Sequence, residues 1–358
     1  MLRPTTKDLA KAAGVSLATV DRVLNGRPGV REETVTAVNT AITRLGFVRN
    51  LSAANLARSR VYRLAFLLPA EGDQFLATVE NHIVEAAKSF ETEGIQVSLR
   101  RVLGKDPHQI ATLLATITPD DLDGVSILAP ESPQLRDATA RLRERGVAVV
   151  RLLAGVAQAD GTDVVGIDNR AAGATAARLI GRFCAASPGQ ILVIADTMNA
   201  RDSVERRQGF DRVITHDFPG MVALPSLETH GDPERTRAIL SNSLANHPGI
   251  TAAYVLSAEA RLPLEVLAQM PGPVRRVTIA HERTAFTERL LLGGGLDAVI
   301  AQNAGHLVRS AIRVLRARCD GRAPIASQEE IRIEILLPDN LGNAAHQGGL
   351  RLASSGGA

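Results

Sequence analysis

Apolar and polar positions alternate with helical spacing over the first 46 residues of the chain. The pattern predicts one short helix that begins after Thr5 and ends at Gly14, and a second that begins after Ser16 and runs through Leu24. A third amphipathic stripe ends at Gly46. Three helices of this length are typical of a helix-turn-helix bundle, whose second helix enters the major groove of DNA.

From Tyr62 onward, short apolar runs alternate with amphipathic stretches. The predicted strands are 62–69, 95–101, 124–129, 147–153, 163–167, 190–195, 221–225, 251–257, 274–280, 297–302 and 331–337. The predicted helices are 73–93, 107–117, 133–145, 169–185, 200–216, 232–245, 259–270, 284–292 and 304–319. Repeated strand–helix units imply parallel sheets with helices on both faces. Because some eleven strands exceed one ordinary sheet, we expect two α/β lobes.

The composition is that of a folded protein, with 45% hydrophobic and 22% charged residues in a chain of 358. That length indicates two or three domains. No apolar run approaches the roughly 18 residues of a membrane span, and no signal-like stretch follows Met1, so we expect a cytoplasmic protein without a membrane partner. Cys184 and Cys319 lie far apart without metal-type spacing, so neither a disulfide nor a metal site is expected.

Charge is divided unevenly along the chain. Residues 1–60 carry ten Lys and Arg against four Asp and Glu, a net charge of +6, and the remainder carries −3. A basic head on a mildly acidic body is typical of a polyanion-binding module attached to a second function. Trp is absent and aromatic residues make up only 3% of the chain, which disfavours a single-strand nucleic-acid platform built from stacked rings.

The segment from Thr6 to Gly26, TKDLAKAAGVSLATVDRVLNG, resembles the DNA-binding head of the LacI/GalR family of bacterial transcription regulators. The match is long and ungapped. It implies that three residues read bases, namely Leu17, Ala18 and Arg22. It also implies phosphate contacts at Ser16, Thr19 and Asn25, and it includes Thr6 among the DNA-binding residues.

Asp21 departs from the family pattern, which usually has Ser at that position. A carboxylate beside Arg22 repels phosphate, but it also accepts from a cytosine amino group or orients Arg22 towards guanine. Both roles stay open. Leu17 and Ala18 make only apolar contacts, so Arg22 is the strong direct base reader by chemistry.

The segment 49–60 is small, basic and capable of forming a helix. A helix of this length is marginal in water, so the segment is either a helix that forms on binding or a plain linker. In the LacI/GalR family it is a hinge helix that pairs across a dimer in the minor groove. The resemblance therefore makes Leu56 a wedge between bases and adds Asn50 and Asn55 to the DNA-binding residues.

The body, 61–342, resembles the type I periplasmic-binding-protein fold, which the family uses to sense effectors. The likeness is carried by VGIDNRAAG from Val165, SVERRQGF from Ser203 and DAVIAQN from Asp297, and it is greatest to sugar-binding proteins of ABC importers. We expect three crossovers between the lobes, near 154–164, 294–300 and 325–332. Ligands of open α/β sheets bind beyond the carboxyl ends of strands, so we expect the effector in the cleft between the lobes.

The same resemblance implies a set of effector-binding residues, which are Phe75, Asp168, Arg206, His281, Glu282 and Gln302. Arg206 occupies the family's ligand-binding Arg position, and Glu282 replaces an Asp at a strand end. Ala258 lies where the family commonly has a ligand-binding Asn. Fixed donors and acceptors suit a sugar or polyol, because each buried hydroxyl needs a partner.

Structural alternatives remain for these residues. Arg206 would otherwise pair with an acidic neighbour on its own helix, such as Glu205. Phe75 would pack a helix, 281–282 would form a surface turn, and Gln302 would cap a strand.

The sequence therefore predicts an all-α helix-turn-helix head (1–48), a hinge (49–60), a two-lobed α/β body (61–342) and a disordered glycine-rich tail (343–358). As a function it predicts a dimeric transcription regulator of the repressor type. Its partners would be a pseudo-palindromic double-stranded DNA operator and a sugar or polyol effector, with no cofactor. A sugar-binding protein without a DNA role and a nucleoid-type architectural protein are the alternatives.

An enzyme is disfavoured by the absence of catalytic motifs. The sequence contains no P-loop, no G-x-S-x-G and no H-E-x-x-H. A G-x-G-x-x-A match at Gly293 follows a predicted helix and precedes a strand, the reverse of a dinucleotide-binding turn.

Overall fold

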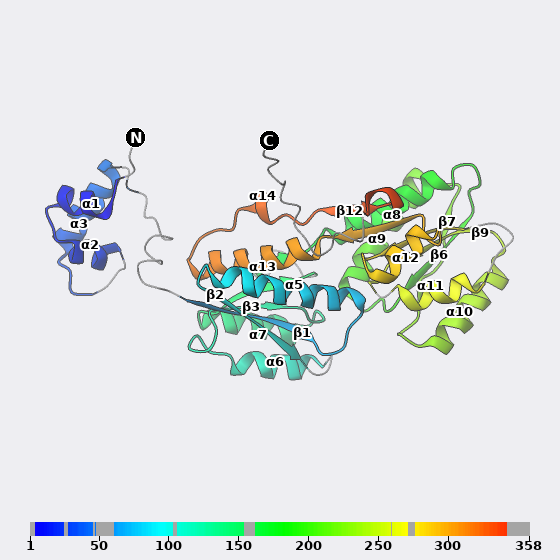
Figure 1. Ribbon diagram of the computed structural model, residues 1–358, viewed down its shortest axis with the longest axis horizontal. Helices are drawn as coiled ribbons and strands as arrows, with labels where there is room; N and C mark the ends of the chain where they lie inside the picture. Colours follow the sequence, from blue (N-terminus) through cyan, green and yellow to red (C-terminus); the bar gives the residue numbers. More distant parts are fainter. Residues whose placement is uncertain are drawn as a thin grey trace, which may run out of the picture. The chain divides into compact units, whose positions relative to one another are not determined.

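The computed structural model describes residues 4–24, 28–45, 47, 61–102, 106–153, 162–258, 260–270 and 276–341 (Figure 1). They belong to two compact units, Met1–Arg60 and Val61–Ala358. Four predicted DNA-binding residues, Asn25, Asn50, Asn55 and Leu56, lie outside the described residues, as does the predicted tail. The roles assigned to them stay predictions.

The first unit contains the three predicted helices, which are α1 (Thr6–Ala13), α2 (Leu17–Leu24) and α3 (Glu32–Leu45). The Asp8 backbone N–H donates to Thr5 Oγ1 at 3.3 Å, and the Thr5 N–H donates to Asp8 Oδ2 at 2.8 Å. This reciprocal cap confirms the predicted start of α1. Gly14 ends α1 with φ of 67°, and Ser16 Oγ accepts from the Thr19 N–H at 3.1 Å to begin α2.

A small apolar core joins these helices. Leu9 of α1, Val20 of α2 and Val38 of α3 are all buried. The Arg44 guanidinium also donates from Nη2 to the Ala12 carbonyl at 3.1 Å, which ties α3 to the end of α1. The predicted three-helix bundle is therefore present, and its apolar stripes face inward as expected.

The first lobe of the body is a five-stranded parallel sheet in the order β2-β1-β3-β4-β5. Its strands are β1 (Tyr62–Pro69), β2 (Ile95–Val102), β3 (Gly124–Ile127), β4 (Ala148–Leu152) and β5 (Asp163–Val165). Its helices are α5 (Gln74–Glu91), α6 (Pro107–Thr116), α7 (Pro133–Glu144) and, from late in the chain, α13 (Ala304–Cys319). Helices α5 and α13 cover one face of the sheet, and α6 and α7 pack against the other.

The second lobe has a seven-stranded path, β12-β11-β10-β9-β6-β7 with β8 beside β6, in which only the β11–β12 pair is antiparallel. Its strands are β6 (Gln190–Ala195), β7 (Val222–Ala223), β8 (Leu227–Glu228), β9 (Ile250–Val255), β10 (Val277–His281), β11 (Ala298–Gln302) and β12 (Ile333–Leu336). Its helices are α8 (Asn169–Phe183), α9 (Arg201–Asp217), α10 (Pro233–Asn246), α11 (Arg261–Ala268) and α12 (Ala285–Leu292). A short α14 (Ala326–Glu329) and a 3₁₀ turn (Pro338–Asn340) complete the described elements.

The chain passes between the lobes at places that differ in part from those predicted. The first passage is at 166–168, between β5 and α8, a few residues after the expected 154–164. The second is at Asn303, between β11 and α13. The expected 294–300 instead covers the turn before β11 and the first half of that strand, because the single residue Asn303 gives no loop-like composition. The third, at 330–332, lies within the predicted 325–332.

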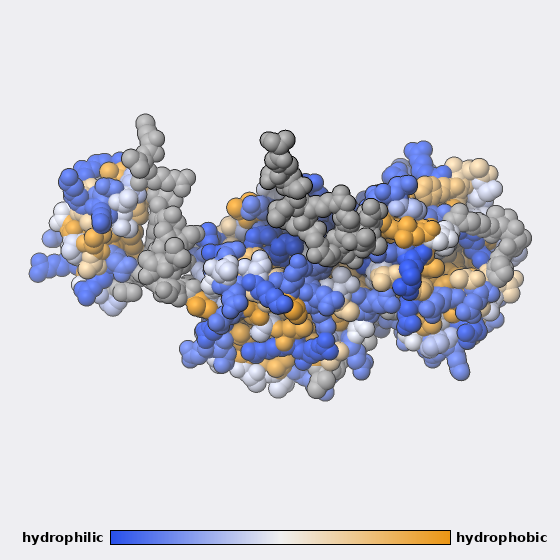
Figure 2. Space-filling model, viewed as in Figure 1, coloured by the Kyte–Doolittle hydropathy of each residue, from blue (hydrophilic) through white to orange (hydrophobic). Residues whose placement is uncertain are grey.

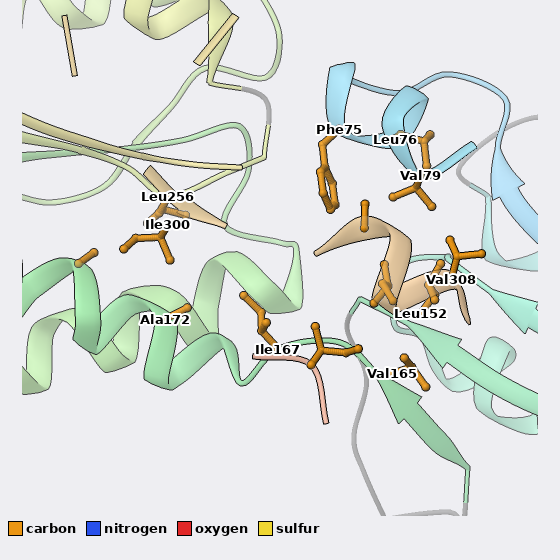
Figure 3. Packing of buried hydrophobic residues seen from close by; sticks show 14 of the residues in the cluster. Phe75, Leu76, Val79, Leu152, Val165, Ile167, Ala172, Leu256, Ile300 and Val308 are labelled. Carbon is orange, nitrogen blue, oxygen red and sulfur yellow. The ribbon is translucent and has the colours of Figure 1, made fainter. Parts of the chain in front are cut away.

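One apolar cluster extends through both lobes. Phe75 and Leu76 of α5 belong to it together with Ile167, Leu256 and Ile300 (Figure 3). In Figure 3 the Phe75 ring extends from the first turn of α5 into the region between the labelled residues of the two lobes. The strand ends of the two lobes therefore approach each other across apolar side chains.

Helices α8 and α9 cross in direct backbone contact at two glycines. A Cβ added to Gly173 would lie 1.9 Å from the Arg206 carbonyl oxygen, and one added to Gly209 would lie 1.9 Å from the Arg170 carbonyl oxygen. Real Cβ atoms do not approach backbone oxygen so closely, so only glycine permits this crossing. The crossing also brings the start of α8 beside Arg206 on α9.

Replacing Gly209 with alanine should destabilise the protein, although alanine favours a helix by about 1 kcal/mol over glycine. The added methyl group must push α9 away from α8, and overpacking of this kind costs about 1–3 kcal/mol. Urea unfolding of the full chain measures the change. Gly220→Ala is the matched control, because its nearest neighbour would be Pro188 Cβ at 3.6 Å. An unchanged midpoint for Gly209→Ala would contradict the tight crossing.

The face shown in Figure 2 has hydrophilic and apolar side chains interspersed over the body. Across the part of the chain that the structure describes, no helix combines the length and apolar character needed to cross a membrane.

Candidate functional site

The exposed face of α2 carries the predicted base-reading residues. Leu17 is 47% exposed, and Ala18 and Arg22 are exposed as well, whereas Val20 is buried in the core. Ala18 and Arg22 are one helical turn apart, so they share a face. Asp21, the departure from the family pattern, is half-buried next to Arg22.

The other described DNA-binding candidates lie at helix starts. Thr6 opens α1 and is exposed. Ser16 and Thr19 lie at the beginning of α2, where their hydroxyl oxygens are 2.9 Å apart and hydrogen-bonded. Hydroxyls and backbone N–H groups at a helix N-terminus are suited to phosphate oxygens, since the terminal N–H groups carry partial positive charge.

In the body, Arg206 is the centre of a buried polar network. Its side chain comes from α9 and is only 3% exposed. Its Nε donates to Asn169 Oδ1 at 2.9 Å, its Nη1 to the Leu256 carbonyl at 2.8 Å and its Nη2 to Glu282 Oε1 at 3.0 Å. These contacts hold the planar guanidinium in one orientation. They use three of its five N–H groups, and no described residue accepts a hydrogen bond from the other two.

Glu282 and Gln302 complete the network from two neighbouring strand ends. Gln302 Nε2 donates to Glu282 Oε1 at 3.0 Å, and the Gln302 backbone N–H donates to Glu282 Oε2 at 3.2 Å. Burial raises the pKa of the Glu282 carboxyl, and the Arg206 charge and the Gln302 hydrogen bonds oppose that rise. Arg206 and Glu282 compensate each other's charge.

His281 is buried beside this network and bonded to a tyrosine. Its Nε2 lies 2.9 Å from the Tyr254 hydroxyl, and the Tyr254 ring stacks on Phe210 with centroids 4.6 Å apart. Burial, helped by the Arg206 charge, holds the pKa of His281 well below its usual range, so the imidazole is neutral. Burial likewise raises the pKa of Tyr254.

Two buried polar atoms at these strand ends have no protein partner among the described residues. They are His281 Nδ1 and Gln302 Oε1. A buried polar atom without a partner costs about 1–3 kcal/mol, so such atoms mark places where a ligand or water supplies the missing bond. Gln302 Oε1 accepts, so its missing partner is a donor such as a hydroxyl.

The structure thus brings together Arg206, Glu282 and Gln302 of the predicted effector residues, with His281 adjacent. The surface alternatives do not hold: the residue that pairs with Glu205, at 2.9 Å, is Arg201, and 281–282 is buried rather than a surface turn.

Two other predicted effector residues have structural roles in the described fold, and their contact with an effector stays a prediction. Asp168 is exposed and caps α8, accepting from the Ala171 N–H at 3.0 Å, so its carboxylate serves the helix terminus. Phe75 lies in the first turn of α5 rather than in the preceding loop, and at 3% exposed it packs in the apolar cluster.

Asn169, the Leu256 carbonyl and Tyr254 were not predicted from the sequence. Asn169 is the first residue of α8 and is 3% exposed. The sequence offered one signal for Asn169, which is its position directly after a strand-to-helix turn and next to Asp168. A backbone carbonyl such as that of Leu256 leaves no trace in a sequence.

Comparisons with known proteins agree with this architecture. A model of the periplasmic binding protein domain matches residues 64–323, and a model of bacterial regulatory proteins of the lacI family matches residues 5–50. The chain belongs to the periplasmic-binding-protein-domain family and carries a lacI-family DNA-binding domain.

Curated relatives of this lacI-type chain include transcription regulators. The maltose regulon regulatory protein MalI of Escherichia coli is 31% identical over 165 residues, which is 46% of each chain. Catabolite control protein A of Priestia megaterium is 29% identical over 125 residues, 35% of this chain and 36% of the relative. The chain therefore spans less than half the length of the curated relatives it matches.

Solved structures share the fold of the body. A solute-binding protein of an ABC transporter from Burkholderia graminis, in complex with D-arabinose, has a TM-score of 0.68 at 18% identity and covers 80% of this chain and 98% of its own. The glucose-galactose binding protein GanP of Geobacillus stearothermophilus has a TM-score of 0.68 at 16% identity, covering 79% and 99%. At these identities the likeness establishes the type I periplasmic-binding-protein fold.

Proposed function

We propose that the protein is a cytoplasmic, non-enzymatic transcription regulator that binds double-stranded DNA through α2 and responds to a small neutral sugar or polyol. The observation that carries the effector half is the buried network of Arg206, Glu282 and Gln302, with the unpartnered Gln302 Oε1 at its edge. The DNA half is supported by the exposed Leu17, Ala18 and Arg22 on the second helix of a helix-turn-helix bundle.

Charge argues for a neutral effector. The positive charge of Arg206 is already compensated by Glu282, so a charged ligand would add an uncompensated charge beside a buried pair. A hydroxyl instead matches both the remaining Arg206 N–H groups and the free Gln302 oxygen, because it donates and accepts.

A single short recognition helix contacts only one half-site of an operator. We therefore propose that the protein binds a pseudo-palindromic operator as a homodimer. In this proposal the hinge residues Asn50, Asn55 and Leu56 act at the centre of the operator. Effector binding shifts the balance between two arrangements of the lobes, and this changes operator affinity.

Selection from random duplexes with the full chain should recover a pseudo-palindrome. Sugars and polyols added to the selected complex should then change its gel-shift affinity. Recovery of non-palindromic or single-stranded sequences alone would contradict the dimeric reader. Binding to any duplex without preference would favour an architectural protein, and sugar binding with no DNA binding would favour a sugar-binding protein.

A further inference from the structure

The buried polar network lies at the places where the chain passes between the lobes. Asn169 follows directly on the first passage, and Gln302 directly precedes the second, Asn303. The third passage leads into Ile333, which pairs with Gln302 in the β11–β12 ladder. Both ends of the network are therefore joined through the backbone to connections between the lobes, and one end is joined to a further connection through the sheet.

A continuous chain of hydrogen bonds joins these two ends. Asn169 Oδ1 accepts from Arg206 Nε at 2.9 Å, and Arg206 Nη2 donates to Glu282 Oε1 at 3.0 Å. The Glu282 carboxylate also accepts from Gln302, from Nε2 at 3.0 Å and from the backbone N–H at 3.2 Å. All four residues are between 0% and 4% exposed. Water competes little with bonds buried this deeply, so a shift of one member acts strongly on the next.

Asn169 serves this chain of bonds and not the helix that it begins. The cap of α8 is Asp168, which accepts from the Ala171 N–H at 3.0 Å. Asparagine is a weaker helix former than alanine, so helix formation does not explain an amide at this position. Because Arg206 Nε can only donate, the oxygen of the Asn169 amide must face it. The buried amide therefore holds the guanidinium beside the first passage.

We propose that Asn169 is a positioning residue that transmits effector binding to the passages between the lobes. A sugar bound by Arg206 and Gln302 uses the same guanidinium and amide that hold the chain of bonds together. A ligand shifts an equilibrium between two lobe arrangements only if it binds them with different affinity, and the bond from Arg206 to Asn169 supplies that difference at the first passage. This inference rests on the proposed function, since it names the regulatory link of the same site.

Amide hydrogen exchange of the full chain, without added ligand, tests the chain of bonds. Asn169→Ala should speed exchange of the Gln302 amide about tenfold, the factor expected when one hydrogen bond to a charged group is lost. The Gln302 amide donates to Glu282, and Glu282 is held less firmly once Arg206 has lost its Asn169 partner. Circular dichroism checks that the variant is folded.

Arg207→Ala is the matched control on the same helix. Arg207 donates to Asp211 Oδ2 and to the Leu224 carbonyl, each at 2.8 Å, and both bonds lie outside the network. Its loss should change exchange at Gln302 less than about twofold. Unchanged exchange at Gln302 in a folded Asn169→Ala, or equal acceleration by Arg207→Ala, would overturn the inference and leave the proposed function standing.

The regulatory half of the inference is measured with D-glucose, D-galactose, D-arabinose and D-allose. Calorimetry of the full chain gives sugar affinity, and gel shifts give the affinity for the selected operator with and without sugar. Asn169→Ala should still bind sugar, about tenfold more weakly, but the ratio of the two operator affinities should fall to within about twofold of one. A wild-type ratio would overturn the inference. If none of these sugars binds the unsubstituted protein or changes its operator affinity, the sugar-responsive function fails and the inference fails with it.

A second variant tests the chain of bonds from its other end if Asn169→Ala fails to fold. Gln302→Leu removes the amide that donates to Glu282 Oε1. Exchange should then rise about tenfold at the Ala172 amide in the first turn of α8, which donates to the Asp168 carbonyl at 2.9 Å. Unchanged exchange at Ala172 in a folded Gln302→Leu would overturn the inference.

Discussion

Arg206→Ala should abolish effector binding and lower the free energy of unfolding by about 3–5 kcal/mol. An Arg206 paired only with an exposed neighbour on its own helix, the alternative that the sequence left open, would leave folding nearly intact. The structure shows a different arrangement. Arg206 and Glu282 are 3% and 0% exposed and 3.0 Å apart, so removing the guanidinium leaves a carboxylate buried without its counter-charge. Urea unfolding measures the stability, and calorimetry with an identified sugar measures binding.

The loss of stability can be separated from the loss of sensing by a second variant. Arg206→Met combined with Glu282→Leu removes both charges, and such apolar replacements of buried pairs are often neutral or stabilising. This double variant should recover much of the stability and still fail to bind the sugar. Arg141→Ala, which breaks an exposed pair with Asp137, should cost less than about 1 kcal/mol. Wild-type sugar affinity in Arg206→Ala would refute the assignment of Arg206.

The periodic parts of the fold were predictable because their signal is local. Alternating apolar runs gave each long strand within a few residues, since strands of a parallel sheet covered on both faces are continuously apolar. A two-residue strand carries no periodicity, and the sequence therefore did not predict β8. The second passage between the lobes was misplaced for a related reason: Asn303 alone forms it, and a single residue has no composition to read.

The candidate site could be predicted only in part, because its contacts join distant residues. Arg206 meets Asn169 and Glu282 across 37 and 76 positions of the chain. Only the family resemblance placed Arg206 and Glu282, and no local pattern distinguishes the buried Asn169 from the neighbouring helix-capping Asp168. Burial itself, which makes His281 neutral and Phe75 a core residue, arises from packing between elements.

Arg22→Ala should weaken binding to the selected operator by about ten- to hundredfold for each half-site, if the guanidinium makes a bidentate contact with guanine. Arg22 is exposed on α2 and shares its outer face with Ala18, so its loss leaves the core residue Val20 undisturbed. A symmetric operator contains two such contacts, so the loss of binding free energy should be about twice that of one contact. Fluorescence anisotropy at fixed salt measures it, because affinity for DNA depends steeply on salt.

The informative comparison for Arg22 is between the operator and random duplex DNA. A base-reading Arg22 affects mainly the operator, so the variant should lose discrimination and tolerate other bases at one position of each half-site. Lys11→Ala removes the same charge from the exposed side of α1 and should weaken operator and random DNA alike, without changing base preference. Since Leu17 and Ala18 offer only apolar contacts, discrimination at a guanine position has no other strong reader on α2. Equal weakening on both kinds of DNA by Arg22→Ala would reduce this residue to a phosphate contact. Asp21 would then be the next candidate for base specificity on the same helix.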